Sequence, residues 1–177
     1  MFVSKMKKNK RKGFTLIEML IVIALIGILA GVVISVINIP KTQARSRDSK
    51  RVGDIKRIQA ALELYFSDNR KYPVSTSWKN VQNISELLPS YIDRMPVDTG
   101  ESISNSSQRC YGFTTREYKY GTNSSGGGYV LMATMELIES ASPSKCSSIP
   151  NCEPSKGFPC SGGASTQDYC YCAQNPM

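Results

Sequence analysis

The feature that most constrains this chain is an almost unbroken apolar segment from Phe14 to Ile39, which follows directly on a basic stretch. About 20 apolar residues are enough to span a bilayer as a helix, and this segment is longer. A secretory signal peptide has a shorter apolar region, on the order of 7–15 residues, that ends at a small-residue cleavage site. The segment therefore predicts a membrane helix that the mature protein keeps.

The net charge of +8 is concentrated ahead of the apolar segment. Residues 1–13 contain no acid, and their bases are Lys5, Lys7, Lys8, Lys10, Arg11 and Lys12. The rest of the chain is close to neutral, so its charge does not indicate a nucleic-acid binder. With 41% hydrophobic and 20% charged residues, the chain is also not a wholly disordered one.

Two features inside the apolar segment indicate more than an anchor. Glu18 is its only charged residue, and a carboxylate in lipid costs several kcal/mol unless it is paired or neutralised. It therefore either reaches the headgroups from the helix end or has a function. Gly27 and Gly31 form a G-x-x-x-G pair, a spacing at which small residues let two helix backbones approach closely. The segment is thus predicted to associate with other helices.

The residues Lys12-Gly13-Phe14-Thr15-Leu16-Ile17-Glu18, followed by the apolar segment, resemble the prepilin motif of type IV pilins and of their pseudopilin relatives. The resemblance implies cleavage between Gly13 and Phe14 and N-methylation of the new terminal Phe14. It also implies that Glu18 helps subunits to assemble. The chain departs from the family at Ser35, where many pilins have a helix-kinking proline, because the first proline here is Pro40.

Apolar residues continue at steps of three and four beyond this segment, at Val52, Ile55, Ile58, Leu62, Tyr65 and Phe66. This period predicts an amphipathic helix, and a proline can kink a helix without ending it. We predict one long helix from Phe14 to about Asn69 with a disturbance near Pro40. The basic stretch from Lys41 to Arg57 is interpreted as a solvated helix face beside anionic headgroups, with DNA contact as the less favoured interpretation.

A small head is predicted after the helix. Tyr72-Pro73 ends the helix, because a residue before proline is pushed out of the helical region. A short helix is predicted over Val81–Leu88, and a loop from there to Asp98. Strand composition at Glu117–Tyr120 and Tyr129–Met135, on either side of a Gly/Ser/Asn turn, predicts the central hairpin.

The predicted fold class is therefore α+β, with a long amino-terminal helix packed through its amphipathic half on a small antiparallel sheet. A disulfide-rich loop region follows at the carboxyl end. The predicted parts are a leader over residues 1–13, a transmembrane and assembly helix over 14–39, an amphipathic helix with a pilin-like head over 40–140, and a Cys-rich region over 141–177.

Six cysteines are expected to form disulfides, because their number is even and the head is expected outside the cytoplasm. They are Cys110, Cys146, Cys152, Cys160, Cys170 and Cys172. Cys170 and Cys172 are too close in sequence to bridge each other comfortably, so each should pair with an upstream cysteine. Six cysteines allow 15 pairings, and the sequence leaves them open. A zinc site of thiolates is the rival, but the chain has no C-x-x-C pair and no histidine.

No catalytic residue is predicted, because the chain has no histidine, the side chain that most often serves as general base. The protein is expected not to be an enzyme. Asp98 and Glu101 share a loop with Ser102 and Ser104, and such oxygen atoms are calcium ligands. The preferred interpretation is that these acids are solvated, and no cofactor is assigned.

The motif and the helix together predict a structural subunit that polymerises with copies of itself into a type IV pilus-like filament. A pseudopilin of a type II secretion system is the alternative, and a monomeric membrane-tethered binding domain is a further one. The cysteine-rich tail slightly favours a surface pilus. The leader is placed in the cytoplasm and the head outside it, because disulfides need an oxidising compartment. The resemblance implies as partners the prepilin peptidase and methyltransferase and an inner-membrane assembly machinery, with membrane lipid around the helix before assembly.

Overall fold

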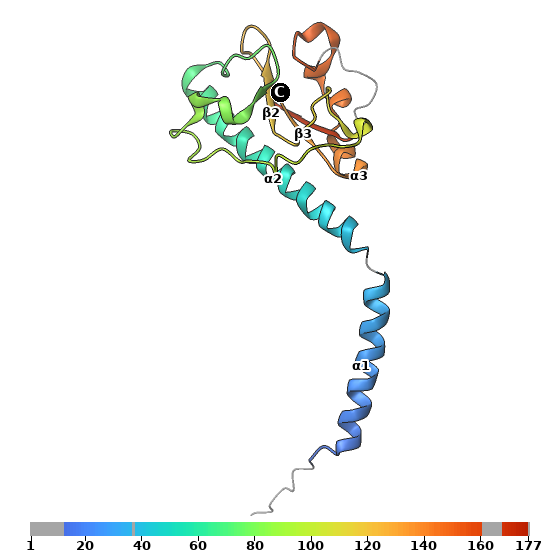
Figure 1. Cartoon of the computed structure of the whole chain (residues 1–177). Helices are drawn as coiled ribbons and strands as arrows, with labels where there is room; N and C mark the ends of the chain where they lie inside the picture. Colours follow the sequence, from blue (N-terminus) through green and yellow to red (C-terminus); the bar gives the residue numbers. More distant parts are fainter. Residues whose placement is uncertain (1–12, 37, 161–167, 177) are drawn as a thin grey trace, which may run out of the picture. The chain divides into compact units, whose positions relative to one another are not determined.

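The computed structural model describes residues 13–36, 38–160 and 168–176. They form two compact units that divide between Ile39 and Pro40 (Figure 1). The first holds the helix α1 (Leu16–Val36), and the second holds the head and, from its second residue on, the helix α2 (Ile39–Asn69). Residues 1–12 of the predicted leader lie outside the described residues.

The long helix expected from Phe14 to about Asn69 is divided in two. Asn38 is not helical, and Pro40 is the second residue of α2. A proline fits the first turn of a helix, because the N–H it lacks would have no partner there, whereas in a helix interior its ring clashes with the carbonyl four residues earlier. Pro40 therefore begins a new helix instead of only disturbing a continuous one. The predicted end at Asn69 agrees with the structure.

The head contains one antiparallel sheet of four strands in the order β1-β2-β3-β4. The predicted hairpin is present as β2 (Lys119–Thr122) and β3 (Tyr129–Thr134), with Tyr120 opposite Leu131. The edges are the two-residue strand β1 (Lys79–Asn80) and β4 (Cys170–Gln174). Neither edge strand was predicted, and β4 lies in the tail that was expected to be a loop.

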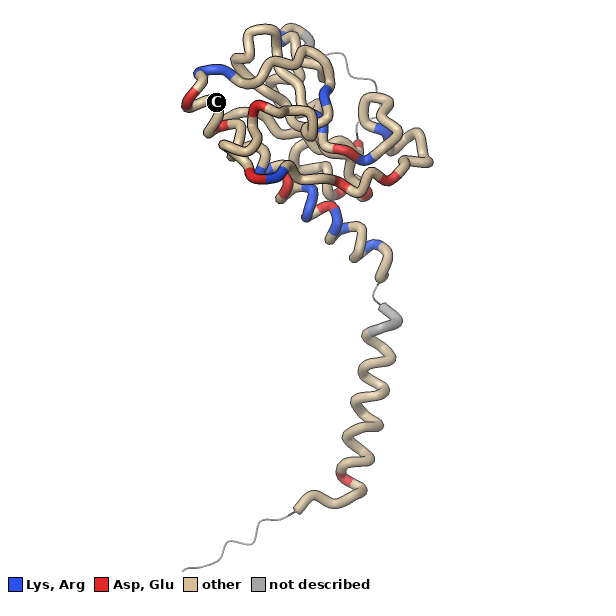
Figure 2. The backbone as a smooth tube through the Cα atoms, turned by 60° about the vertical axis from the view of Figure 1, so that its left-hand side comes forward, with Lys and Arg blue, Asp and Glu red and all other residues tan. Residues whose placement is uncertain are grey.

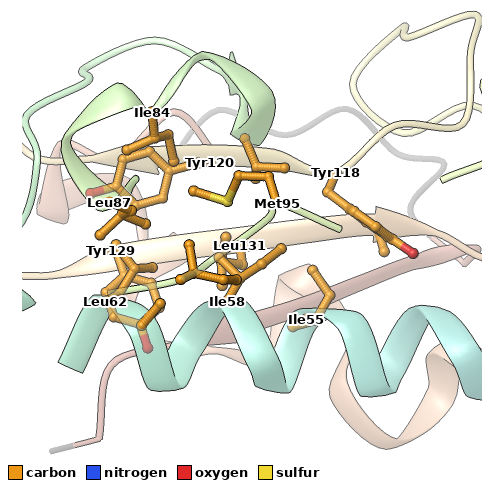
Figure 3. Packing of buried hydrophobic residues seen from close by; sticks show 14 of the residues in the cluster. Ile55, Ile58, Leu62, Ile84, Leu87, Met95, Tyr118, Tyr120, Tyr129 and Leu131 are labelled. Carbon is orange, nitrogen blue, oxygen red and sulfur yellow. The ribbon is translucent and has the colours of Figure 1, made fainter. Parts of the chain in front are cut away.

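The two faces of the sheet pack against different partners, because successive residues of a strand point to opposite sides. Tyr129 and Leu131 of β3 face α2, where Ile55, Ile58 and Leu62 are fully buried against them (Figure 3). Val130 and Met132 face the other way, into a cluster that contains all the paired cysteines except the partly buried Cys152, which packs at its edge. The apolar residues predicted to recur along α2 thus lie on the side of the helix that faces the sheet.

The short helix predicted over Val81–Leu88 is present as two 3₁₀ turns, Val81–Asn83 and Ser85–Leu87. Val81, Ile84 and Leu87 are all buried at intervals of three residues. A 3₁₀ turn repeats every three residues, so it places these side chains in one row where an α-helix would spread them. A four-residue helix, α3 (Ile138–Ala141), follows β3. The other 3₁₀ turns are η3 (Ser106–Gln108), η4 (Ser142–Ser144), η5 (Cys146–Ser148), η6 (Pro150–Cys152) and η7 (Pro154–Lys156).

Three disulfides hold the second face of the sheet. They pair Cys110 with Cys170, Cys146 with Cys172, and Cys152 with Cys160. The first two attach segments from elsewhere in the chain to β4, whose inward cysteines both bridge upstream. The third closes a short loop within the tail. The predicted fold class, including its disulfide-rich carboxyl region, is confirmed.

The disulfides that close the longest and the shortest loop should differ in their effect on stability. The Cys110–Cys170 bridge joins residues 60 positions apart and the Cys152–Cys160 bridge joins residues 8 apart. A bridge that closes a longer loop removes more entropy from the unfolded chain. Replacing the first pair by serine should therefore destabilise the head by about 1–2 kcal/mol more than replacing the second. Urea unfolding of the full-length protein in detergent, followed by the fluorescence of Trp78, the only tryptophan, measures both. Equal losses would show that chain entropy does not set the contribution of these bridges.

Candidate functional site

The surface of α1 is apolar and uncovered. Every large apolar side chain from Phe14 to Val33 is between 46% and 84% exposed. The helix has 21 residues and is therefore about 31 Å long, close to the thickness of the hydrocarbon core of a bilayer. By length and composition Leu16–Val33 can cross a membrane. Such a surface needs lipid or another apolar helix around it.

The amino-terminal end of α1 is closed by a capping box. The Glu18 Oε2 atom accepts hydrogen bonds from the backbone N–H and the hydroxyl of Thr15, both at 2.8 Å. In return the Thr15 Oγ1 atom accepts from the Glu18 N–H at 3.3 Å. These reciprocal bonds satisfy two N–H groups that a helix start leaves without partners. Within a single chain the one carboxylate of α1 is therefore bonded to its own helix end.

This role of Thr15 was not predicted, although the sequence carries its signal. A Ser or Thr followed three residues later by Glu, directly before an apolar run, is the pattern of a capping box. Thr15 and Glu18 have that spacing.

The other predicted residues of α1 lie open on its surface. Phe14, just before the helix, is 79% exposed. A Cβ atom added at Gly27 or at Gly31 would meet nothing within 4 Å beyond the helix itself. The two glycines thus leave a shallow place on the helix where a second backbone can come close. Their roles in processing and assembly stay predictions.

In the head, Arg51 forms a buried ion cluster that attaches α2 to two other segments. Its Nε donates to Asp98 and its Nη1 to Asp48 and Glu136, each at 2.8 Å, and its side chain is 1% exposed. Asp48 also accepts the N–H groups of Glu136 and Leu137 at 2.9 and 3.0 Å. The cluster therefore fixes the loop at Asp98 and the connection after β3 onto the helix.

The electrostatics of the cluster are most visible at Glu136. Arg47 donates to both of its oxygens, at 2.8 and 2.6 Å, and this contact, joined by that of Arg51, lowers the pKa of Glu136 to about 2. Burial opposes the shift but does not cancel it. For Arg51, burial alone would lower the pKa, but its bonds to Asp98, Glu136 and Asp48 raise it. Both groups stay charged at neutral pH.

The residues considered as possible calcium ligands do not come together around one point, and Asp98, which was expected to be solvated, has a side chain that is 4% exposed. Asp98 is used by the ion cluster through Oδ2, and its Oδ1 accepts from the Thr99 N–H at 2.7 Å. Glu101 is 62% exposed and lies 3.6 Å from Arg116. Ser102 forms an isolated bridge with Thr115. Among residues 13–36, 38–160 and 168–176, no three acidic or sulfur side chains converge as metal ligands.

Comparison with known proteins gives one family-model match, the prokaryotic N-terminal methylation motif, over residues 8–34. The chain is 35% identical to the type II secretion system core protein G of Pseudomonas aeruginosa over 102 residues, which are 52% of this chain and 70% of that protein. It is 37% identical to the protein of the same name from Aeromonas hydrophila, with the same coverage.

A relative with a different name matches a shorter part. The chain is 43% identical to the type IV major pilin protein PilA of Myxococcus xanthus over 63 residues, which are 36% of this chain and 28% of that protein. No solved structure gives a significant match. The resemblance to the prepilin-type families is thus confirmed, and it reaches well beyond the motif for the proteins of the secretion system.

Removing the central cation of the ion cluster should destabilise the head strongly. Arg51→Ala leaves buried carboxylates without their partner, which typically costs about 3–5 kcal/mol. Arg57→Ala is the matched control, because Arg57 is exposed on the same helix and its loss should change stability by less than about 0.5 kcal/mol. Urea unfolding of both full-length variants, followed at Trp78, measures the difference. Equal midpoints for the two variants would contradict a structural role for the cluster.

The lowered pKa of Glu136 predicts an acid-dependent loss of stability. Because the folded state lowers this pKa from 4.5 to about 2, the contribution is complete above pH 4.5 and is lost as the pH falls towards 2. Its size is on the order of 3 kcal/mol. Glu136→Gln cannot titrate, so the gap in unfolding free energy between wild type and variant should shrink across this window. A gap that stays constant from pH 6 to pH 2.5 would contradict the assignment.

Proposed function

The chain belongs to the family of the type II secretion system core protein G, a family of structural subunits, and from this membership we propose that it is a pseudopilin. In this proposal the precursor is cut after Gly13, methylated at Phe14, and polymerised through α1 into a filament. The protein acts as a building block and performs no catalysis.

The observation that carries the proposal is the uncovered surface of α1. Its large apolar side chains from Phe14 to Val33 are exposed, and burying such surface is worth about 25 cal/mol per Å². In the membrane, lipid covers this surface before assembly. In a filament, helices of neighbouring subunits cover it, with Gly27 and Gly31 where two backbones come close.

Glu18 gives the assembly its register in this proposal. Cleavage after Gly13 creates an amino group on Phe14, and an ammonium in an apolar environment is as costly as a carboxylate. In the single subunit Glu18 is bonded to Thr15. In the filament it pairs with the Phe14 amine of a neighbour, so that each charge offsets the other. A helix displaced by one turn would leave both charges without a partner.

A surface pilus, the function that the sequence analysis favoured, is now the less favoured function. The matches to the core protein G relatives span about half of this chain and 70% of each relative. The match to the pilin spans 28% of that relative. The disulfide-held tail is the observation that still favours a pilus, because it suits exposure outside the cell. Deletion of the gene separates the two functions: a pseudopilin mutant should lose secretion of exported enzymes, and a pilin mutant should lose surface fibres.

The membrane topology is part of the proposal. Basic residues flank the apolar segment on both sides, so charge alone does not decide the orientation. The three disulfides favour a head that folds outside the cytoplasm, which supports a leader on the cytoplasmic side. There the prepilin peptidase and the inner-membrane assembly machinery can act on it.

Processing predicts a specific mass for the cellular protein. The intact mass should correspond to loss of residues 1–13 and gain of one methyl group. Gly13→Leu should leave the chain uncut in the membrane, because a bulky residue replaces the glycine of the prepilin motif. An uncut wild-type chain would support the monomeric membrane-tethered domain instead.

The two partners of the capping box should differ in assembly. Glu18→Val should insert into the membrane but fail to form filaments, because the neighbour's amine has lost its partner. Thr15→Val removes the cap and keeps the carboxylate, so it should still assemble. The ratio of sheared filament to membrane-pool subunit, measured by immunoblot, reports both. If both variants lose filaments equally, Glu18 acts only as a cap, and if Glu18→Val assembles normally, the pairing is wrong.

A further inference from the structure

The charges of α2 are sorted between its two sides. The helix has four acids, Asp48, Asp54, Glu63 and Asp68, and every one is hydrogen-bonded to the head. The donors, at 2.7–3.0 Å, are the amides of Glu136 and Leu137 and the hydroxyls of Tyr118, Tyr72, Tyr129 and Tyr91. All four carboxylates of the helix therefore bind donors of the head.

The bases of α2 are only partly used in this way. Arg51 is buried in the ion cluster, and Lys41 and Arg47 form ion pairs with Glu139 and Glu136. The four that remain are exposed and form no ion pair within the described residues: Arg45, Lys50, Lys56 and Arg57. Figure 2 shows basic positions recurring along the helix. We call the surface made by these four residues the basic face.

The basic residues of this face are regularly spaced, and the residues between them are small. Lys50 and Arg57 are seven residues apart, about two turns, and Arg45 and Lys56 are eleven apart, about three turns, so each pair forms a row along the helix. The residues between the rows are exposed and small: Ser46, Ser49, Gly53 and Ala60. Two rows of long cationic side chains on either side of a strip of small residues fit a broad anionic surface.

A groove of about 460 Å³ borders the basic face at Lys50 and Arg57. Arg94 adds a third cation to its lining. Two acids also line it, Asp54 and Asp93, and Asp54 accepts a hydrogen bond from Tyr118. Three bases against two acids leave the lining weakly positive, and the hollow is large enough to hold a phosphate group.

A second copy of the same face is a poor partner, because like charges would meet. A membrane with anionic headgroups around α1 would be a partner of opposite charge. The basic face begins at Arg45, nine residues after the last residue of α1, the helix that can cross a membrane. Cations that come within a Debye length of anionic headgroups are attracted by them.

We propose that, before assembly, the basic face of α2 lies on the anionic phospholipid headgroups of the membrane that holds α1. The inference rests on the proposed membrane insertion of α1, and it does not depend on whether the filament is a pseudopilus or a pilus. It gives the subunit a docked state in the membrane pool, which it leaves when it enters the filament.

Acetylation of lysines, read by mass spectrometry, tests the proposal on the full-length protein in liposomes. Lys50 and Lys56 should be acetylated about fivefold more slowly in vesicles with 30% phosphatidylglycerol than in pure phosphatidylcholine. Half-molar salt should remove the protection. Lys71 and Lys156, exposed elsewhere on the head, serve as internal controls and should react equally in both. Equal rates for Lys50 and Lys56 in the two kinds of vesicle would overturn the proposal.

A matched pair of variants tests the contribution of the face. Arg57→Gln should weaken the protection of Lys50 and Lys56, whereas Arg70→Gln removes one exposed charge beyond the face and should leave it unchanged. Protection that ignores lipid charge and grows with protein density would overturn the proposal in favour of a second copy. Protection that appears only when duplex DNA is added would overturn it in favour of nucleic acid.

Flotation of the same liposomes separates this inference from the proposed function. If the protein does not float with either kind of vesicle, membrane insertion of α1 is wrong and the docking proposal falls with it. If it floats with both while Lys50 and Lys56 stay unprotected, only the docking proposal is wrong.

Discussion

The structure depends on an apolar helix that the fold does not cover. The large side chains of α1 from Phe14 to Val33 are exposed, whereas Ile55, Ile58 and Leu62 of α2 are fully buried. Surface of the first kind is stable only in lipid or against other apolar helices. The head packs around α2, and the apolar surface of α1 suits a membrane or a filament. The same helix therefore suits a subunit held in the membrane and a subunit packed in a filament.

The second helix connects these two requirements, because its sides have different chemistry. One side supplies apolar residues to the sheet and all four acids to tyrosines, backbone amides and Arg51. Buried charges are costly unless they are well paired, and the Arg51 cluster is paired through three carboxylates. Orientation of α2 on the head is thereby fixed by apolar packing and by hydrogen bonds together. What is left for the outer side is positive charge.

The tail solves a different problem. A sheet whose edge strand β1 has two residues covers little surface, and its second face needs a partner. Short 3₁₀ turns do not form a continuous apolar layer, so disulfides hold them there. Cys170 and Cys172, one residue apart on either side of Tyr171, both point to this face because side chains alternate along β4. The tail is thus attached through the strand that it completes.

The sequence by itself determined what local chemistry decides: the apolar helix of membrane length, the prepilin motif around Gly13 and Glu18, the buried period of α2 and the central hairpin. The capping box of Thr15 was equally local and could have been read. The cysteine pairing, strand β4, the division of the helix at Asn38 and the partners of Arg51 were decided only by the tertiary structure. Each depends on segments far apart in sequence, such as Asp98 and Glu136 meeting on α2, and one sequence contains no measure of which distant groups will meet.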